Sequence, residues 1–416
     1  MRVVEGRALL RGRFEQCCIG IEDGKISSIK KIIKGDPHFD FGGNYILPAG
    51  IDIHVHFREP GPTHKEDFDT GTEAAACGGI SCVFDMPNNL PATMDAQTFE
   101  EKRQLAAGKA NVDFGLYLAL QEDSRPKDLS DLRSPFKIFM AGKKGGLAFG
   151  DYGRLKDVLE ETKNTQMHTS VHCEDQNLIA KNDGKSLEEY LRSRPNEAEA
   201  SAIGILADAK AHICHVSARE SLPLLENPNL TSEVTPHHLL LNEHVDLAGF
   251  GKTNPPLRRK ADQMAMWEGL ISGRIDIIAS DHAPHTIEEK QEEFSRVPSG
   301  VPGVETSLPL MLMQVKKGNL NMGRLASAMM ETPAMMMGLE KGSIEIGMDA
   351  DLIAVDLRRI TNIRADNLHS KCGWTPFEKW EAIFPLATFL RGELVSKDGD
   401  IQETGRGMMI QKREKP

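Results

Sequence analysis

The sequence predicts an α/β fold: a (β/α)8 TIM barrel with a small β-sandwich formed by both termini. Two observations predict it. In the middle of the chain, short apolar runs alternate with longer amphipathic segments, which is the pattern of parallel strands connected by helices. At both ends the pattern changes to short strands with polar turns, and neither end has enough apolar residues to bury a core alone. We therefore expect the two ends to pair with each other.

The predicted barrel elements are short apolar strands separated by helix-like stretches. Strands are expected over 51–57, 80–86, 112–120, 136–140, 168–173, 212–216, 230–235 and 275–280. Helices are expected between most of them, at 66–77, 154–163, 187–209 and 261–271.

The predicted terminal strands lie outside this alternating region. They are expected at 3–4, 18–21, 26–29 and around Ile46, and then at 343–346, 351–355 and 389–395. Gly392 and Asp398-Gly399 provide turn residues. The predicted division is residues 1–48 with 344–416 for the composite β-sandwich and 49–343 for the barrel.

Composition limits the partners of the chain. Hydrophobic residues make up 40% of the 416 residues and charged residues 27%, so a large folded core is expected. A formal net charge of −11 argues against nucleic acid or an anionic membrane as partner, and leaves a small-molecule ligand. No apolar run approaches the ~20 residues of a membrane span, and the start lacks a secretory pattern, so a cytoplasmic protein is expected. The seven cysteines form no CxxC pair and are expected as buried thiols rather than disulfides.

Residues of metal-ligand type fall at the ends of the predicted barrel strands, where barrel enzymes hold their active sites. His54 and His56 alternate on one face of the first strand. His172 and His215 lie on the fifth and sixth strands, and Asp281 follows the eighth. A lone strand histidine is more often a core or rim residue. Four imidazoles and a carboxylate at one end of a barrel are instead a set suited to zinc, and predict a metal site.

Lys137, in FKIFM on the fourth strand, is the unusual member of this set. An arbitrary lysine extends to solvent or pairs with a carboxylate. An ammonium that points at metal ions would be repelled, whereas a lysine carboxylated by carbon dioxide is anionic and has two oxygens. Such a carbamate could bridge two metal ions at ~3.5–4 Å, the spacing of two-metal hydrolases.

These residues belong to motifs that resemble a known family. The motifs are IDIHVHFREPG, FKIFM, VHCED, ICHVS, TPHHLLL, TNPPLR, ASDHAPH and ETPAMMMGLEKGSIEIGMDADLIAVD. They resemble the cyclic-amide branch of the amidohydrolase superfamily over nearly the whole chain. That branch contains dihydroorotases, allantoinases and hydantoinases. The resemblance implies a (β/α)8 barrel with a composite terminal β-sandwich, in agreement with the pattern of apolar runs.

Within the branch, HFREPG, MPNN, TNPPLR and DHAPH resemble the dihydroorotases, whereas allantoinases usually carry an asparagine at the position of Arg58. An arginine can grip a substrate carboxylate through two hydrogen bonds, and asparagines suit the amide edges of a ring. Two simpler interpretations remain: Arg58 as an ion-pair partner of Glu59 or Glu66, and Asn88 as a turn residue. The resemblance implies substrate binding by Arg58, Asn88, Asn254 and His285, and metal binding by His54, His56, Lys137, His172, His215 and Asp281.

The activity that the resemblance implies is the reversible cyclisation of N-carbamoyl-L-aspartate to L-dihydroorotate, a step of de novo pyrimidine biosynthesis. It implies two Zn²⁺ per subunit bridged by carboxylated Lys137, with Asp281 as the catalytic proton carrier. The alternatives are an allantoinase or hydantoinase, a deaminase of the same superfamily, or a non-catalytic dihydropyrimidinase-like scaffold. Arg58 argues against an allantoinase and against a hydantoinase. The FKIFM motif argues against a deaminase, and the complete set of metal ligands argues against a non-catalytic scaffold. The sequence does not determine the oligomeric state, and a homo-oligomer is one of the possibilities.

Overall fold

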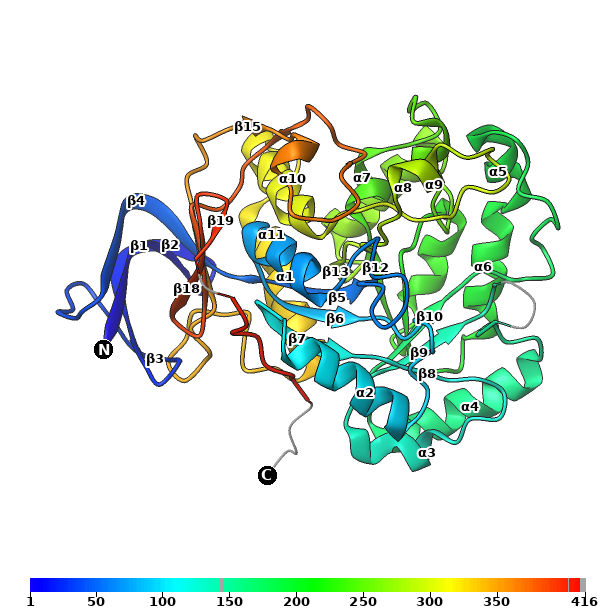
Figure 1. The fold of residues 1–416 in the computed structure, drawn as a ribbon, viewed down its shortest axis with the longest axis horizontal. Helices are drawn as coiled ribbons and strands as arrows, with labels where there is room; N and C mark the ends of the chain where they lie inside the picture. The colour runs from blue at the N-terminus through cyan, green and yellow to red at the C-terminus, as the bar shows by residue number, and fades with distance from the viewer. Residues whose placement is uncertain (143–145, 403, 412–416) are drawn as a thin grey trace.

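The computed structural model describes residues 1–142, 146–402 and 404–411. It has two parts (Figure 1): a sheet that combines strands from both ends of the chain, at the left, and a barrel of parallel strands with helices around it, at the right. The α/β fold class predicted from the sequence is confirmed. Among the described residues, none of the helices combines the length and apolar character that crossing a membrane requires.

The barrel consists of two parallel sheets that join into a ring. A parallel bridge between Val55 and His282 closes the ring. The predicted strand 112–120 is wrong as a single strand, because at Tyr117 the backbone changes partner: Tyr117 N–H donates to Asp85 and Leu118 N–H to Pro135. The strands are β5 (Gly50–Val55), β6 (Ile80–Asp85) and β7 (Asp113–Leu116), then β8 (Leu118–Ala119), β9 (Phe136–Phe139), β10 (Thr169–His172), β11 (Ala211–Ile213), β12 (Leu230–Val234) and β13 (Ile277–Ile278).

The helices that surround the barrel follow the predicted alternation with one correction. The helix expected over 187–209 is wrong as a single helix, since Pro195 divides it. Proline lacks a backbone N–H and pushes the residue before it out of the helical region. The helices are α1 (Phe68–Cys77), α2 (Ala96–Ala107), α3 (Pro126–Leu129), α4 (Tyr152–Thr165), α5 (Leu187–Ser193), α6 (Asn196–Ile205), α7 (Pro236–Leu240), α8 (Lys260–Ser272), α9 (Ile287–Lys290), α10 (Val304–Lys317), α11 (Met322–Ala326) and α12 (Thr332–Met337). Shorter 3-10 or π turns cover Ser130–Leu132, Arg219–Glu226, Ala248–Gly251, Ser327–Glu331 and Ala365–Asn367.

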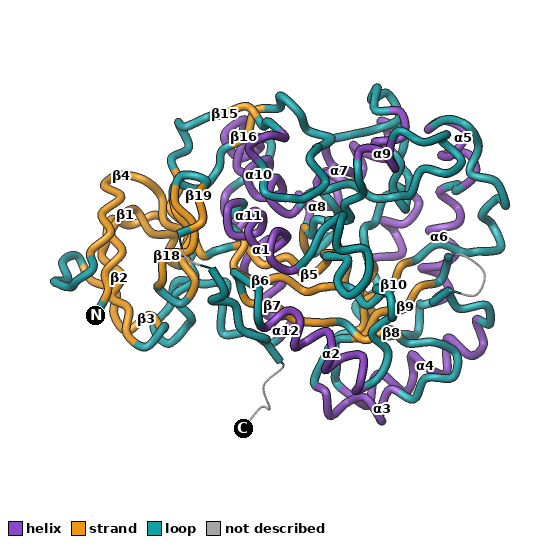
Figure 2. Tube along the Cα trace, in the orientation of Figure 1, coloured by secondary structure: helices purple, strands orange, loops and turns teal. Residues whose placement is uncertain are grey.

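The terminal sheet joins the two ends of the chain through the antiparallel pairing of β4 with β14. Figure 2 shows its strands gathered at one end of the molecule. In order across the sheet, the strands are β19 (Asp400–Ile401), β18 (Glu393–Lys397), β17 (Ala387–Leu390), β14 (Leu352–Val355), β4 (His38–Pro48), β1 (Arg2–Leu10), β2 (Arg13–Glu22) and β3 (Lys25–Lys30). A separate pair is formed by β15 (Thr361–Asn362) and β16 (Glu381–Ala382).

Two predicted terminal strands differ from the structure. The strand expected over 343–346 is wrong: Gly342 and Gly347 on either side of it have φ of 82° and 94°, which interrupts an extended ladder. The strand expected over 389–395 is a hairpin, with Gly392 at φ 76° between β17 and β18. The division at residues 48/49 and 343/344 stays a prediction, and its residues 143–145, 403 and 412–416 lie outside the described residues.

All seven cysteines are free and buried, as expected. The barrel core is apolar, and β5 and β6 are buried along their whole length. Side chains that carry chemistry therefore reach solvent at the ends of the strands rather than along them.

Candidate active site

The carboxyl ends of the barrel strands open into a cavity of about 980 Å³. Two of the predicted ligands lie beyond their strands in the left-handed region of the backbone, His215 at φ 39° and Asp281 at φ 48°. The predicted strands 212–216 and 275–280 are therefore shorter in the structure. With the exception of His285, the predicted site residues all line this cavity: His54, His56, Arg58, Asn88, Lys137, His172, His215, Asn254 and Asp281.

The predicted ligand atoms converge in the cavity. Asp281 Oδ1 lies 3.1 Å from His56 Nε2 and 3.3 Å from His54 Nε2. His172 Nδ1 lies 3.0 Å from His215 Nε2. One ligand atom each of His54, His215 and Asp281 lie within 4.8 Å of one another, and the buried Nδ1 of His215 has no hydrogen-bond partner among the described residues. An orphaned buried nitrogen within a set of imidazoles and a carboxylate fits a bound divalent metal.

Two carboxylates fix the orientation of two of the histidine rings. His54 Nδ1 contacts Glu233, and His172 Nε2 lies 2.9 Å from Glu174. A ring nitrogen held by a carboxylate sets the tautomer and leaves the other nitrogen to a metal. These carboxylates were not among the predicted site residues. Glu174 could have been found, because it lies two residues after His172 in VHCED.

The histidine protonation states also suit metal binding. Burial lowers the pKa of His56 to about 4 and holds that of His172 below its ordinary value. Burial disfavours a charge on Asp281, but the neighbouring His54 and His56 outweigh it and hold the pKa of this carboxyl well below its usual range. Neutral imidazoles and an ionised carboxylate are the forms that bind metals.

His54 differs from the other rings because of its carboxylate neighbour. Burial opposes a charge on the ring, but Glu233 outweighs it and raises the pKa of His54 to about 10. Without a metal the ring is therefore a cation, protonated on both nitrogens. A metal would bind in place of the Nε2 proton, on the Asp281 side, while Nδ1 keeps its proton against Glu233.

Lys137 is fully buried beside this cluster. Its Nζ donates to Cys214 Sγ at 2.8 Å and lies 5.2 Å from the centroid of the Phe139 ring. Cys214 also forms a compact group of ligand-type atoms with His54 and Glu233. Among the described residues, the hydrogen-bond partner of Lys137 is thus a thiol and not a carboxylate, so the ordinary explanation of a buried lysine does not apply.

Arg58 lies at the edge of the cavity with φ 63°. Its Nε donates to Pro284 O at 3.1 Å, and its Nη2 lies 3.2 Å from His285 Nε2. The alternative ion pairs do not form, since Glu59 pairs with Lys109 and Glu66 with His282. Further N–H groups of the guanidinium remain for a substrate carboxylate.

His285 lies behind Arg58, rather than in the lining of the cavity. Lys65 Nζ lies 3.3 Å from His285 Nδ1 and pairs with Glu289 at 2.6 Å. Burial lowers the pKa of His285, as do the adjacent cations Arg58 and Lys65, so the ring is neutral. Lys65 was not predicted, because nothing local in the sequence shows that it meets a residue of the eighth strand end.

The two predicted asparagines are held by their carboxamide oxygens. Asn88 Oδ1 lies 2.7 Å from His56 Nδ1, and Asn254 Oδ1 accepts from the hydroxyl of Tyr190. Both side chains line the cavity, so their amide N–H groups are available to a ligand. Asn88 therefore contacts His56 and lines the cavity, in addition to its place in a turn.

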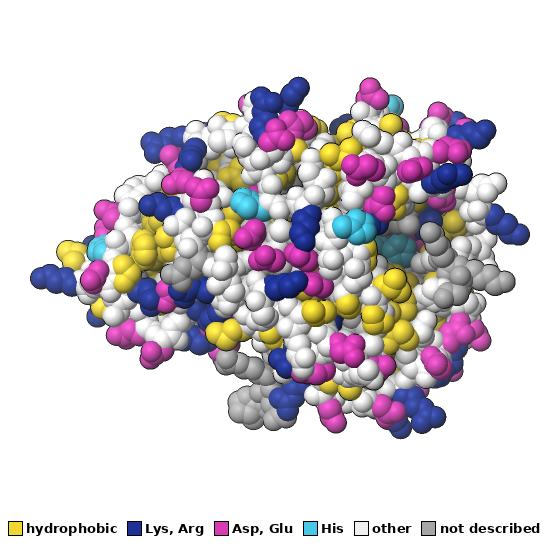
Figure 3. All heavy atoms as spheres, in the orientation of Figure 1, with side chains coloured by type: hydrophobic (Ala, Val, Ile, Leu, Met, Phe, Trp, Pro, Cys, Tyr) yellow, Lys and Arg dark blue, Asp and Glu magenta, His cyan; other side chains and the backbone are white. Residues whose placement is uncertain are grey.

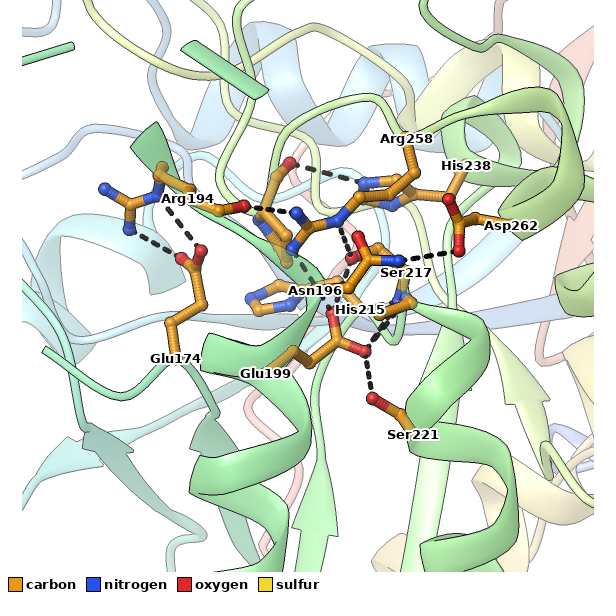
Figure 4. Close-up of polar contacts among 12 residues, drawn as sticks. Glu174, Arg194, Asn196, Glu199, His215, Ser217, Ser221, His238, Arg258 and Asp262 are labelled. Carbon is orange, nitrogen blue, oxygen red and sulfur yellow. Dashed lines mark hydrogen bonds and ion pairs between the residues drawn. The ribbon is translucent and has the colours of Figure 1, made fainter. Parts of the chain in front are cut away.

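A buried polar network supports the segments that follow β10 and β11, where Glu174 and His215 lie (Figure 4). Glu199 of α6 accepts from the backbone N–H of Ser217 at 3.1 Å and from Ser221 Oγ at 2.7 Å. Arg258 Nε donates to Ser217 Oγ at 3.0 Å. Arg194 in turn donates to Glu174, at 3.0 Å through Nε, and so fixes the carboxylate that holds His172. These contacts hold the ligand-bearing loops in place.

The comparison with protein families agrees with this site. The sequence model of the amidohydrolase family matches residues 45–395. The chain therefore belongs to the amidohydrolase family.

Relatives of known name narrow the class further. The chain is 41% identical to a dihydroorotase of Methanosarcina acetivorans, over 94% of this chain and 91% of the relative. It is 38% identical to a dihydroorotase of Pyrococcus furiosus, over 99% and 97%. Among solved structures, the L-hydantoinase (dihydropyrimidinase) of Arthrobacter aurescens superposes with a TM-score of 0.91 at 27% identity, over 99% of each chain. The fold is thus shared with hydantoinases, whereas sequence similarity is higher to dihydroorotases.

Proposed function

We propose that the chain catalyses the reversible cyclisation of N-carbamoyl-L-aspartate to L-dihydroorotate, a step of de novo pyrimidine biosynthesis. The observation that carries the proposal is the position of Arg58 in the same cavity as the ligand set. L-Dihydroorotate has a carboxylate on the same ring as the amide that reacts, and Arg58 provides a guanidinium in the same cavity as the proposed ligands. The names of the archaeal relatives agree with this assignment.

The carboxylate site is built from the Arg58 guanidinium, the neutral His285 ring behind it and the amide groups of Asn88 and Asn254. Arg58 holds its guanidinium in a fixed plane through Pro284 O. A planar donor pair recognises a carboxylate with two parallel hydrogen bonds. Hydantoin and allantoin lack a carboxylate, so they would leave a buried guanidinium without its partner, which is costly.

The residues proposed to hold the metal are those whose ligand atoms converge. When bound, two zinc ions supply a Lewis acid and make water a nucleophile near neutral pH. Lys137 is proposed to be carboxylated, which would turn a buried cation into an anionic bridge; its lack of a carboxylate partner supports this. The proposed ligands are His54, His56, carboxylated Lys137, His172, His215 and Asp281.

Asp281 is proposed to carry the proton. In the hydrolytic direction its carboxylate accepts a proton from the attacking water and delivers it to the ring nitrogen as the C–N bond breaks. In the biosynthetic direction the same steps run in reverse. The ionised state of Asp281, held by the neighbouring His54 and His56, suits the role of proton acceptor. Glu233 and Glu174 keep the rings that surround it in place.

A substrate panel tests the proposal. Purified, zinc-loaded protein is assayed with L-dihydroorotate, allantoin, hydantoin and dihydrouracil, and with N-carbamoyl-L-aspartate in the reverse direction. We expect turnover of L-dihydroorotate and N-carbamoyl-L-aspartate well above that of the rings that have no carboxylate. Faster turnover of hydantoin, dihydrouracil or allantoin would contradict the assignment and favour one of the related amidohydrolases.

A further inference from the structure

A second cluster of chemically active side chains lies where the barrel meets the terminal sheet. Cys77 is the last residue of α1, Glu305 lies in the first turn of α10, and His369 follows the short 3-10 turn Ala365–Asn367. All three line a cavity of about 430 Å³, whose lining residues differ from those of the candidate active site. The proposed function makes no use of this cluster.

The three side chains form a hydrogen-bonded chain. His369 Nε2 lies 3.6 Å from Cys77 Sγ, and His369 Nδ1 lies 2.8 Å from Glu305 Oε1. The other oxygen of Glu305 accepts from the backbone N–H of His369, also at 2.8 Å. Glu305 thus fixes both the ring and its backbone, and directs Nε2 at the sulfur. A nucleophile, a base within reach of it and a third group that orients the base are the arrangement of activated nucleophiles.

The charges around the sulfur agree with this arrangement. The hydrogen bonds with Cys77 and Glu305 raise the pKa of His369 to about 11. His369 therefore has a high affinity for a proton passed from the thiol. The Cys77 thiol donates to Gly399 O at 3.3 Å, and the sulfur accepts from Ser396 Oγ at 3.5 Å. The thiolate is the form of cysteine that attacks electrophiles, so a base within reach of the sulfur is the element of this cluster that matters for reactivity. Cys77 is 2% exposed and lines the cavity, which is the route of access that the proposal requires.

A metal site is the other chemistry that a Cys–His–Glu group can support. Both oxygens of Glu305 are engaged by His369, so Cys77 and His369 are the ligands left. Zinc sites use three or four protein ligands. The contacts therefore favour a reactive thiol over a metal.

We propose that Cys77 is a modification site: a thiol that small hydroperoxides oxidise, with His369 as proton carrier and Glu305 as the residue that positions His369. His369 takes the thiol proton, and the sulfur attacks one oxygen of the peroxide. An S–O bond forms while the O–O bond breaks, and His369 returns the proton to the departing oxygen. Cysteine sulfenic acid and water are the products from hydrogen peroxide, with the sulfur oxidised by two electrons and the peroxide reduced by two.

The protein contains its own reference thiols. Cys82 and Cys173 are buried, and burial raises the pKa of each thiol well above its ordinary value. They should react slowly in the folded protein. The rate at Cys77 can be compared with theirs in one sample, so the central test needs no variant that must fold.

The experiment is dimedone trapping of sulfenic acid in the full-length, metal-loaded protein treated with hydrogen peroxide, read out peptide by peptide by mass spectrometry. We expect Cys77 to be labelled at least ~10-fold faster than Cys82 and Cys173, and His369→Gln to slow it by ~10-fold or more, since a positioned proton carrier contributes at least that much. His244→Gln is the matched control, because the His244 side chain is 76% exposed and forms no part of the cluster. Cys77 in the His244→Gln variant should be labelled at the same rate as Cys77 in the parent protein.

Three results would overturn the proposal. The first is labelling of Cys77 no faster than that of Cys82 and Cys173 in the folded parent protein. The second is a His369→Gln variant that melts near the parent temperature and labels at the parent rate. The third is labelling of Cys77 that begins only after a chelator is added, which would identify the cluster as a metal site.

Discussion

Lys137 and Lys341 are both buried lysines, but their surroundings are opposite. Lys137, at the barrel mouth, has a thiol as its hydrogen-bond partner, at 2.8 Å. Lys341, where the barrel meets the terminal sheet, is surrounded by carboxylates. Burial disfavours its charge, but these carboxylates outweigh the effect and raise the pKa of Lys341. Its Nζ lies 2.8 Å from Asp113, 3.1 Å from Asp349 and 2.6 Å from Asp351.

The difference separates a structural charge cluster from the proposed metal site. The carboxylates around Lys341 come from β7 and from the segment before β14, so the ion pairs join the barrel to the terminal sheet. Within the part of the chain that the structure describes, Lys137 Nζ has no carboxylate partner, and the buried Nδ1 of His215 has no hydrogen-bond partner. Buried polar groups without partners cost stability, and proteins retain them where a ligand completes the set. Figure 3 shows acidic and basic side chains interspersed over the face in view, so net charge alone does not locate a site.

Removal of the metal should have the largest effect. Protein stripped by a chelator should lose its activity on L-dihydroorotate, because the metal that the converged ligands are proposed to hold supplies the Lewis acid and activates the water. Added zinc should restore the activity. Metal content by mass spectrometry and turnover are measured on the same samples. Full activity in thoroughly demetallated protein would contradict the metal proposal.

Asp281→Asn should reduce turnover by at least ~10²-fold, the low end for general acid–base catalysis. The amide keeps an oxygen near His54 and His56 but cannot exchange a proton near neutral pH. Steady-state rates are compared at equal metal content, with Asp398→Asn on the terminal sheet as control. Turnover within a few-fold of the parent would show that Asp281 is not the proton carrier.

Arg58→Lys and Arg58→Met should weaken substrate binding rather than metal binding. Loss of a charge-assisted hydrogen bond, worth ~1.5–3 kcal/mol, should raise KM for L-dihydroorotate by ~10-fold or more. Arg358→Met is the matched control, since that side chain is 81% exposed. Unchanged KM values would make Arg58 a structural residue and weaken the case for a carboxylate-bearing substrate.

Lys341→Met should leave the turnover of folded protein unchanged and reduce its stability. Removal of one partner from a buried charge cluster costs ~3–5 kcal/mol, because carboxylates stay buried without their cation. Chemical denaturation measures the loss. The exposed Lys317, paired with Glu381, supplies the control Lys317→Met, with an expected cost of ~1 kcal/mol or less. A variant of Lys341 that is as stable as the parent, or that loses turnover while folded, would remove the distinction between the two lysines.

Much of the site could be predicted from the sequence because its residues end apolar runs. His54 and His172 follow buried strand residues, so their residue type and position were visible without tertiary information. The same local logic failed at 343–346, where apolar alternation resembles a strand but Gly342 and Gly347 adopt positive φ.

The supporting residues could not be predicted in this way, since their partners are far apart in the chain. Lys65 meets His285 across 220 positions, and Glu233 meets His54 across 179. Pro195 is different: its effect on the predicted helix 187–209 was readable from the sequence. Periodicity thus predicts which strand end a residue occupies, whereas the closed barrel decides which strand ends meet.

The most direct test of the account is the electron density at Lys137 in crystals of metal-loaded, active protein. A carbamate should appear as a planar group continuous with Nζ and in contact with both metals, because an ammonium beside two dications is strongly disfavoured. Lys137→Ala should accordingly lose at least one metal and regain some activity with a small added carboxylic acid. A bare amine at Lys137 in fully metal-loaded, active protein would contradict the account and leave a mononuclear mechanism in its place.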